Sequence, residues 1–204
     1  LWIMGGGYNF LHRGDILRSQ DGELWEVVVE DPPFGEACVT RWGTNNHSIV
    51  VFDNQMYLYA GILPVAYIIG TTPSKGVWAS SDGKVWTQKA TNEDIYGVDD
   101  YRYAAGTVMN GEYYLASTPN ILSTNLDIYK TSDGENWHLV SDDIGYLGAT
   151  IHYQMFSEAG ILYIMFVFDE SGLAIIRSSD GGESWESLSV DGLSSYDYGV
   201  IIKK

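Results

Sequence analysis

Four aspartates of this chain stand in nearly the same local sequence, and carboxylates are side chains that could act as acids, bases or metal ligands. Asp21, Asp82 and Asp133 each follow a serine or threonine by two residues, precede a glycine, and lie four residues before a tryptophan. Asp180 has the same surroundings with one extra glycine. Paired carboxylates about 5–10 Å apart hydrolyse glycosides, but an aspartate before glycine more often forms a turn. We therefore expect these four aspartates to be structural and not catalytic.

Each copy of this motif predicts a β-hairpin. A short apolar run precedes the aspartate, as at Ile175-Ile176, and the tryptophan opens a second run. Asp-Gly between two such runs indicates a tight turn, because glycine takes the positive φ that the turn needs. The carboxylate and the hydroxyl can hydrogen-bond the turn backbone, and the tryptophan can cover it. The predicted structural residues are Ser19, Asp21, Gly22, Trp25, Ser80, Asp82, Gly83, Trp86, Thr131, Asp133, Gly134, Trp137, Ser178, Asp180, Gly182 and Trp185.

The spacing of the motif indicates a repeat architecture. The four aspartates lie 61, 51 and 47 residues apart, and periods of this length are typical of propellers and other arrays. The motif resembles the Asp-box, S/T-x-D-(x)-G-x-x-W, of the BNR repeats in sialidase-like and sortilin-like β-propellers. Only the copy at Asp180 has the full family spacing, since the other three lack the residue between aspartate and glycine. The resemblance implies a β-propeller whose boxes are structural and lie away from the active face.

Two further strand-like runs precede three of the four boxes. With the two strands of the box hairpin, each repeat then has four antiparallel strands, which is the content of a propeller blade. The predicted strand pairs are residues 47–52 and 56–61, residues 103–109 and 112–116, and residues 150–156 and 161–168.

The two ends of the chain together predict the remaining blade. Residues 1–7 match a second strand, with a kelch-like apolar run that ends in glycines, and residues 198–204 match a first strand. We therefore expect an all-β fold, a propeller of four four-stranded antiparallel blades closed by pairing of the N- and C-terminal strands. The blades are residues 1–30 plus 198–204, 47–89, 103–141 and 150–189. The alternative is a segment of a larger propeller of about six to eight blades.

Composition restricts the partners and the compartment. The chain of 204 residues carries a net charge of −16, so we expect neither nucleic-acid binding nor attachment to anionic membranes. No apolar run reaches the length of a membrane span, which predicts a soluble domain. Cys38 is the only cysteine, so it can form no disulfide within the chain, and we expect a small buried side chain. The chain starts at Leu1 and not at methionine, which favours a processed chain or a piece of a longer one.

The loops opposite the boxes are the predicted binding face, because long loops on a rigid scaffold usually carry function. They combine acidic and aromatic residues, which suits a glycan or a protein surface, including a basic one. The alternative is a solvated surface with aromatics that pack the loops. The candidate binding residues are Phe34, Arg41, Trp42, Tyr67, Tyr96, Asp99, Asp100, Tyr101, Arg102, Tyr146 and Tyr196.

No cofactor or metal site is expected. His47 and His152 fall on innermost strands, but the other two blades offer no ligands at matching positions, so channel histidines are favoured. The acid pairs Asp99-Asp100 and Asp142-Asp143 leave Ca²⁺ open as an alternative, although neither fits a known calcium loop.

Two functions follow from these observations. The favoured one is a non-catalytic module that binds a glycan or protein at a cell surface, outside the cell or in a larger assembly such as a virion. It rests on the missing sialidase Phe/Tyr-Arg-Ile-Pro motif and on too few arginines, since only Arg13, Arg41 and Arg102 fall outside the outer strands. The alternative is a sialidase-like or other glycoside hydrolase, because a generic glycosidase needs only two suitably spaced carboxylates.

Overall fold

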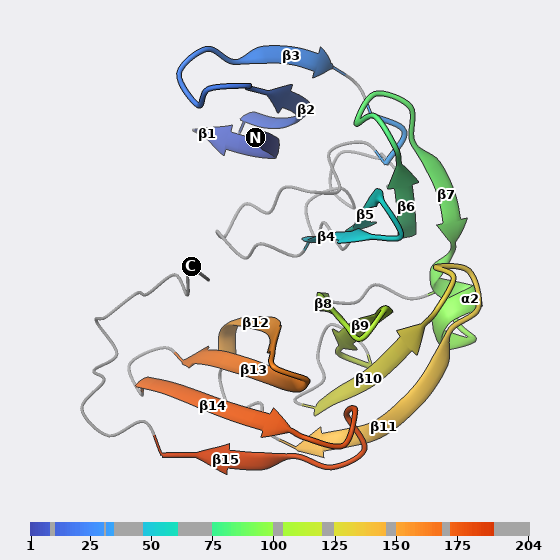
Figure 1. Cartoon of the computed structure of the whole chain (residues 1–204), viewed down its shortest axis with the longest axis vertical. Helices are drawn as coiled ribbons and strands as arrows, with labels where there is room; N and C mark the ends of the chain where they lie inside the picture. The colour runs from blue at the N-terminus through green and yellow to red at the C-terminus, as the bar shows by residue number, and fades with distance from the viewer. Residues whose placement is uncertain are drawn as a thin grey trace.

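The computed structural model describes residues 1–8, 11–30, 32–34, 47–60, 75–99, 104–119, 125–145, 150–168 and 172–189. Within these residues the chain forms four antiparallel sheets and one short helix, which confirms the all-β prediction. The sheets follow one another around an arc in a propeller-like arrangement, with the first and the last sheet at its two ends (Figure 1). The helix has 5 residues, and no helix in the described part of the chain is long and apolar enough to cross a membrane.

Strands that follow one another in the chain lie side by side in each sheet. The first sheet contains β1 (Trp2–Tyr8), β2 (Leu11–Arg18) and β3 (Glu26–Val29). The second contains β4 (His47–Phe52), β5 (Gln55–Ala60), β6 (Gly76–Ser80) and β7 (Thr87–Ala90). The third contains β8 (Ala104–Met109), β9 (Glu112–Ser117), β10 (Asn125–Thr131) and β11 (His138–Gly145). The fourth contains β12 (Thr150–Glu158), β13 (Ile161–Phe168), β14 (Gly172–Ser178) and β15 (Glu186–Leu188).

The closed ring of four blades stays a prediction. The three four-stranded sheets extend over residues 47–90, 104–145 and 150–188, beside predicted blade limits of 47–89, 103–141 and 150–189. The first sheet has three described strands, and the segment expected to complete it, residues 198–204, lies outside the described residues. The distance between Leu1 and Lys204, which would test closure, depends on these residues. The larger propeller therefore stays the alternative.

Tight turns join the first two strands of the second, third and fourth sheets. Asn110 and Gly111 both have positive φ, at 52° and 78°, and so do Ala159 and Gly160, at 51° and 78°. Positive φ at both central residues is the conformation that matches the twist of a two-residue hairpin. These turns occur where the sequence predicts them, and they set the register of the innermost strands.

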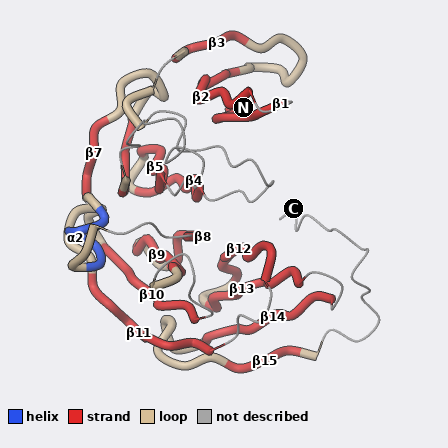
Figure 2. Tube along the Cα trace, turned by 180° about the vertical axis from the view of Figure 1, so that it is seen from behind, coloured by secondary structure: helices blue, strands red, loops and turns tan. Residues whose placement is uncertain are grey.

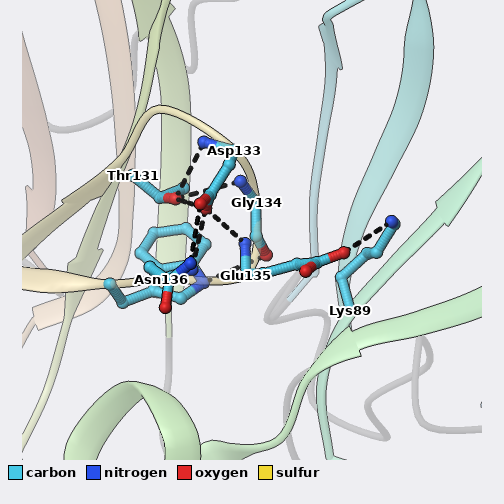
Figure 3. A network of polar contacts seen from close by, with 7 residues as sticks. Lys89, Thr131, Asp133, Gly134, Glu135 and Asn136 are labelled. Carbon is cyan, nitrogen blue, oxygen red and sulfur yellow. Dashed lines mark hydrogen bonds and ion pairs between the residues drawn. The ribbon is translucent and has the colours of Figure 1, made fainter.

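The repeated motif forms the turn between the last two described strands of each sheet. We call residues 19–25, 80–86, 131–137 and 178–185 the repeat turns. In the third repeat turn, Oδ1 of Asp133 accepts the backbone N–H groups two and three residues further on, at 2.9 and 2.8 Å (Figure 3). The Thr131 hydroxyl accepts the Gly134 N–H at 2.9 Å and donates to Asp133 at 2.9 Å. The Trp137 indole N–H donates to the Gly134 carbonyl at 3.3 Å.

The other repeat turns use the same hydrogen bonds. Oδ1 of Asp21 and of Asp82 accepts two backbone N–H groups each, and Oδ1 of Asp180 accepts that of Ser184, all at 2.8–3.0 Å. The indole N–H of each tryptophan donates to the turn glycine carbonyl at 3.1–3.2 Å. Because four copies of one short sequence form one set of contacts, the turn geometry follows from the local sequence.

These hydrogen bonds stabilise the charged form of the four aspartates. The pKa of Asp21 and of Asp82 lies below its usual range, mainly because of the backbone N–H groups of Leu24 and Val85. For Asp133 and Asp180 the pKa is lowered further, first by the side chains of Asn136 and Ser184 and then by their backbone N–H groups. The carboxylates therefore stay charged at neutral pH, which suits turn formation and not proton donation.

An aromatic residue on the strand just before the motif hairpin of one sheet packs against the repeat turn of the next sheet. Trp2 and Tyr57 each stand opposite the residue just before the serine of their own repeat turn. A Cβ added to Gly83 would lie 2.4 Å from the Trp2 ring, and one added to Gly134 would lie 2.4 Å from the Tyr57 ring. Tyr114 occupies the same position in the third sheet, and its hydroxyl lies 3.6 Å from where a Cβ of Gly181 would be. We call this the ring-to-turn contact.

The hydrophobic core is divided into three clusters, one between each pair of consecutive sheets. The first contains Leu58 and Trp86, the second Tyr59 and Leu115, and the third is centred on residues of the third and fourth sheets. An ion pair between Lys89 on β7 and Glu135 in the third repeat turn, at 2.8 Å, also joins two sheets (Figure 3). Since exposed ion pairs contribute little, apolar burial between the sheets supplies most of the stability.

Gly134→Ala tests the ring-to-turn contact, with Gly111→Ala as its matched control. Both glycines have φ near +79°, but a Cβ at Gly111 meets nothing within 4 Å in the described part of the chain. Gly111→Ala should cost about 1–2 kcal/mol for the backbone alone. Gly134→Ala should cost about 1–3 kcal/mol more, because the new methyl group overlaps the Tyr57 ring. Equilibrium urea unfolding measures both, and equal losses would show that the contact contributes nothing.

Acid unfolding tests the hydrogen-bonded aspartates. Their folded pKa values are lowered below the unfolded value of about 3.9, so their stabilisation is complete above that pH. It is lost as the pH falls through the folded values. We expect the melting temperature to fall steeply below about pH 4. The double variant Asp133→Asn/Asp180→Asn should have a lower melting temperature than the unmodified chain at pH 7. Its melting temperature should fall less than that of the unmodified chain as the pH is lowered.

Asp142→Asn is the control for that measurement, because it removes one charge from the exposed part of β11. Melting temperatures between pH 2 and pH 7 would be compared for the three proteins. A double variant whose acid profile parallels that of the unmodified chain would contradict the assignment of acid sensitivity to the repeat turns.

Candidate functional site

A pocket of about 290 Å³ lies between the innermost strands of three consecutive sheets. These strands, β4, β8 and β12, are the edge strands nearest the middle of the arc (Figure 2). We call it the inner-strand pocket. The lining residues are Ser48, Ile49, Ala104, Ala105, Gly106, Tyr153, Gln154 and Met155.

Small residues at the start of β8 create this space. Ala104, Ala105 and Gly106 stand in sequence where the strand passes between its neighbours. A Cβ on Gly106 would lie 2.8 Å from the Ser48 hydroxyl oxygen and 2.6 Å from the Tyr113 ring. Glycine is therefore required at this position, because a side chain would displace the packed residues of β4 and β9.

The polar groups of the pocket are uncharged. The Ser48 hydroxyl, the Gln154 amide and the Tyr153 side chain belong to its lining, together with apolar Ile49 and Met155. The Tyr153 hydroxyl donates to the Ala116 carbonyl at 3.5 Å, which holds the ring in place. Hydroxyl and amide groups beside an aromatic ring offer the hydrogen bonds and the apolar contact that a neutral sugar requires.

The pocket and the repeat turns lie at opposite ends of the sheets. The lining residues stand in the first halves of β4 and β8 and in the middle of β12, whereas the repeat turns follow the last residues of β6, β10 and β14. Since the first and third strands of an antiparallel sheet run in the same direction, their beginnings share one face. This is the loop face where the sequence analysis places the candidate binding residues.

Phe34 belongs to the core and not to an exposed binding face. It is 1% exposed, and its ring makes edge contacts with Trp78 and Trp86 at centroid distances of 6.0 and 5.3 Å. The residue thus packs the second sheet against the first. The physical reason for the misplacement is that an aromatic side chain in a loop buries itself wherever neighbouring sheets leave apolar space.

Tyr96 also packs between sheets. It ends helix α2 (Asn92–Tyr96), and its ring contacts Tyr129 at 5.0 Å and Tyr59 at 6.4 Å. The helix starts with a capping box in which Thr91 and Asp94 bond each other's backbone N–H groups, and the Thr91 contacts lower the pKa of Asp94. The helix lies beside the outer strands β7 and β11 (Figure 2), so Tyr96 closes the outer gap between two sheets.

Asp99 is exposed and bound to a lysine. Lys75 Nζ lies 3.1 Å from its carboxylate oxygen and 3.3 Å from its carbonyl oxygen. The other candidate binding residues lie outside the described residues. They are Arg41, Trp42, Tyr67, Asp100, Tyr101, Arg102, Tyr146 and Tyr196.

The described acids form no facing pair in the pocket. Asp142 is exposed on β11, and the Asp143 carboxylate accepts the side chain of Asn125. The Asp143 N–H donates to Asp127 at 3.2 Å on the outer part of the third sheet. No acid is among the pocket-lining residues of the described chain. Within the same residues, no three histidine, cysteine, aspartate or glutamate side chains gather closely enough to hold a metal ion.

The lining residues of the pocket were not among the predicted site residues. The predictions fell on the loops and on the histidines of the innermost strands, whereas the cavity lies on other residues of these strands. The run Ala104-Ala105-Gly106 at the start of a predicted strand was the available signal. Three small residues in succession weaken a strand unless something else occupies the space beside it.

Comparison with solved structures finds the same fold in enzymes. The chain is similar to an alpha-L-arabinofuranosidase from Clostridium thermocellum, with a TM-score of 0.53 and 15% identity over 93% of this chain and 67% of that one. It is also similar to the arabinanase Arb43A of Bacillus subtilis, with a TM-score of 0.51 and 16% identity over 87% of this chain and 68% of that one. A protein of unknown function from Dyadobacter fermentans has a TM-score of 0.53 and 17% identity, over 89% and 60%.

At these identities the likeness shows the fold alone. The chain spans 60–68% of the length of these three proteins. No family model matches the sequence, and no curated protein matches it. Kinship with the Asp-box families therefore stays a prediction.

The comparison contradicts the favoured function from the sequence. A non-catalytic binding module was expected because the chain lacks a sialidase arginine motif, but two of the three structural neighbours above are an arabinofuranosidase and an arabinanase with a similar fold. That prediction is wrong because it compared the chain with sialidases alone, whereas a generic glycosidase needs only two suitably spaced carboxylates. The alternative, a glycoside hydrolase, agrees better with the comparison.

Proposed function

We propose that this protein is a glycoside hydrolase that binds one sugar unit in the inner-strand pocket. The observation that carries the proposal is the pocket itself, which combines hydroxyl, amide and aromatic groups at the centre of a fold found in glycosidases. Its volume of about 290 Å³ is at the lower end of the range for small-molecule sites. Since the two neighbours of named activity are an arabinofuranosidase and an arabinanase, α-L-arabinofuranosides are the first substrates to test.

The carboxylates in this proposal come from segments that lead into the innermost strands. Asp94 is bound in the helix cap, and Asp99 is paired with Lys75, so neither is free for proton transfer. Asp100 stands four residues before Ala104, and among the acids that precede a lining residue of an innermost strand it is the nearest along the chain. We therefore assign Asp100 as one of the two carboxylates that glycoside hydrolysis requires.

Filling the pocket should abolish the activity. Ala105→Trp places an indole among the lining residues, whereas Val85→Trp adds the same side chain on the opposite rim, where Val85 is 70% exposed. Hydrolysis of a panel of aryl glycosides, arabinofuranoside included, measures kcat/KM for each variant. We expect Ala105→Trp to lose at least about tenfold, which corresponds to 1.4 kcal/mol, and Val85→Trp to stay within about twofold. Thermal melts verify that both variants fold.

Asp100→Asn removes the proposed catalytic carboxylate and is tested with the same hydrolysis assay. Loss of a general acid or base should lower kcat by about 100-fold or more without preventing substrate binding. Asp142→Asn, on exposed β11, is the matched control and should keep full activity. A chain that hydrolyses none of the glycosides contradicts the proposed function. Full activity of Ala105→Trp would instead mean that the pocket is not the site.

A further inference from the structure

The three junctions between consecutive sheets share two contacts. At the first two, the ring of Trp2 or Tyr57 lies against the glycine of the next repeat turn, Gly83 or Gly134. At the third, the Tyr114 hydroxyl lies 3.6 Å from the Cβ position of Gly181, the first of two glycines in that turn. The tryptophan of that next turn also packs against the preceding sheet, and Trp86 is only 7% exposed. Trp137 and Trp185 join the second and third core clusters in the same way. A junction thus requires a ring from one sheet and a turn from the next.

The last sheet has a ring for which the described chain provides no turn. Tyr163 stands opposite Arg177, the residue just before the serine of its own repeat turn, which is the register of the three other rings. It is partly exposed and stacks on Phe156, with ring centroids 5.0 Å apart and an interplanar angle of 6°. Leu162 and Ile164, its neighbours on β13, point to the opposite face and are buried against the third sheet.

The first sheet has a turn for which the described chain provides no ring. A Cβ on Gly22 would meet only Leu1, from the same sheet, within 4 Å among the described residues. Trp25 is 37% exposed, five times the exposed fraction of Trp86, and Val27 beside it is 50% exposed. Each of the other three sheets buries the face that carries its repeat-turn tryptophan against the preceding sheet. In the first sheet this face is exposed.

We propose that the Tyr163 face of the last sheet and the Gly22 turn of the first sheet bind one further unit of the same repeat, inserted between them. That unit presents a Ser/Thr-x-Asp-Gly turn to Tyr163 and an aromatic ring to Gly22. The proposed unit continues the established junctions, in which a ring meets the next turn at Gly83 and Gly134 and a tyrosine hydroxyl reaches Gly181. These junctions leave Tyr163 and the Gly22 turn without such a contact among the described residues. Direct closure of four sheets would place Tyr163 on Gly22, where the structure has Leu1. The inference is independent of the proposed function, and its test measures no activity.

Cysteine labelling tests whether the Tyr163 face is open. Tyr163→Cys and Tyr114→Cys are made in a Cys38→Ser background, and their rates of maleimide labelling are compared over a range of protein concentrations. Cys at 163 should react at least about tenfold faster than Cys at 114 at every concentration, because only the latter lies in a filled junction. Equal slow rates in dilute solution would mean that the chain covers this face itself. Protection that grows with concentration would mean that a second copy covers it, and either result overturns the proposal.

Supplying the missing unit tests what the face binds. A copy of residues 91–145, the third repeat with its preceding loop, is joined after Lys204 in the Tyr163→Cys chain. Labelling at 163 should then slow to the rate seen at 114, whereas an unchanged rate would overturn the proposal. The same extension with Gly134→Val in the copied unit should restore fast labelling, because its turn no longer accepts a ring. Gly111→Val in the copy is the control for backbone strain and should leave the protection intact.

Discussion

The structure depends on one steric constraint, the close approach of an aromatic ring to a glycine in the turn of the next sheet. At Gly83 and Gly134 no Cβ could be accommodated, since it would lie 2.4 Å from the ring of Trp2 or Tyr57. The same glycines need positive φ to form the turn. Glycine at these positions therefore allows both the turn conformation and the close distance between the two sheets.

Hydrogen bonding makes the turn rigid enough to act as a spacer. The aspartate and the hydroxyl residue of each repeat turn occupy backbone N–H groups that would otherwise face solvent, and the tryptophan N–H binds the glycine carbonyl. The hydroxyl residues are buried and the aspartates are exposed, so each turn is fixed from its inner and its outer side. The free energy comes instead from the three apolar clusters between the sheets, which the turns hold in register.

The repeat turns and the strands beside them were predictable because their signals are local. Asp-Gly with a following tryptophan determines its own hydrogen bonds, and Asn110-Gly111 determines its own turn. Phe34 was misplaced because the direction of a loop side chain depends on distant sheets, here on Trp86. Tyr96 is half-buried against Tyr129, and its binding role stays a prediction. The helix that carries Tyr96 was foreseeable, since Thr91 and Asp94 have the spacing of a capping box. The pocket was not, because it arises between strands about 50 residues apart in the chain.

Hydrogen exchange of the tryptophan indole N–H groups, followed by NMR, tests the central role of the ring-to-turn contact most directly. All four indoles donate to a turn glycine carbonyl at 3.1–3.3 Å, so local hydrogen bonding alone predicts similar protection. If packing against the preceding sheet holds the turns, Trp86, Trp137 and Trp185 should exchange slowly and Trp25 at least about tenfold faster. Equal exchange at all four tryptophans would contradict the account.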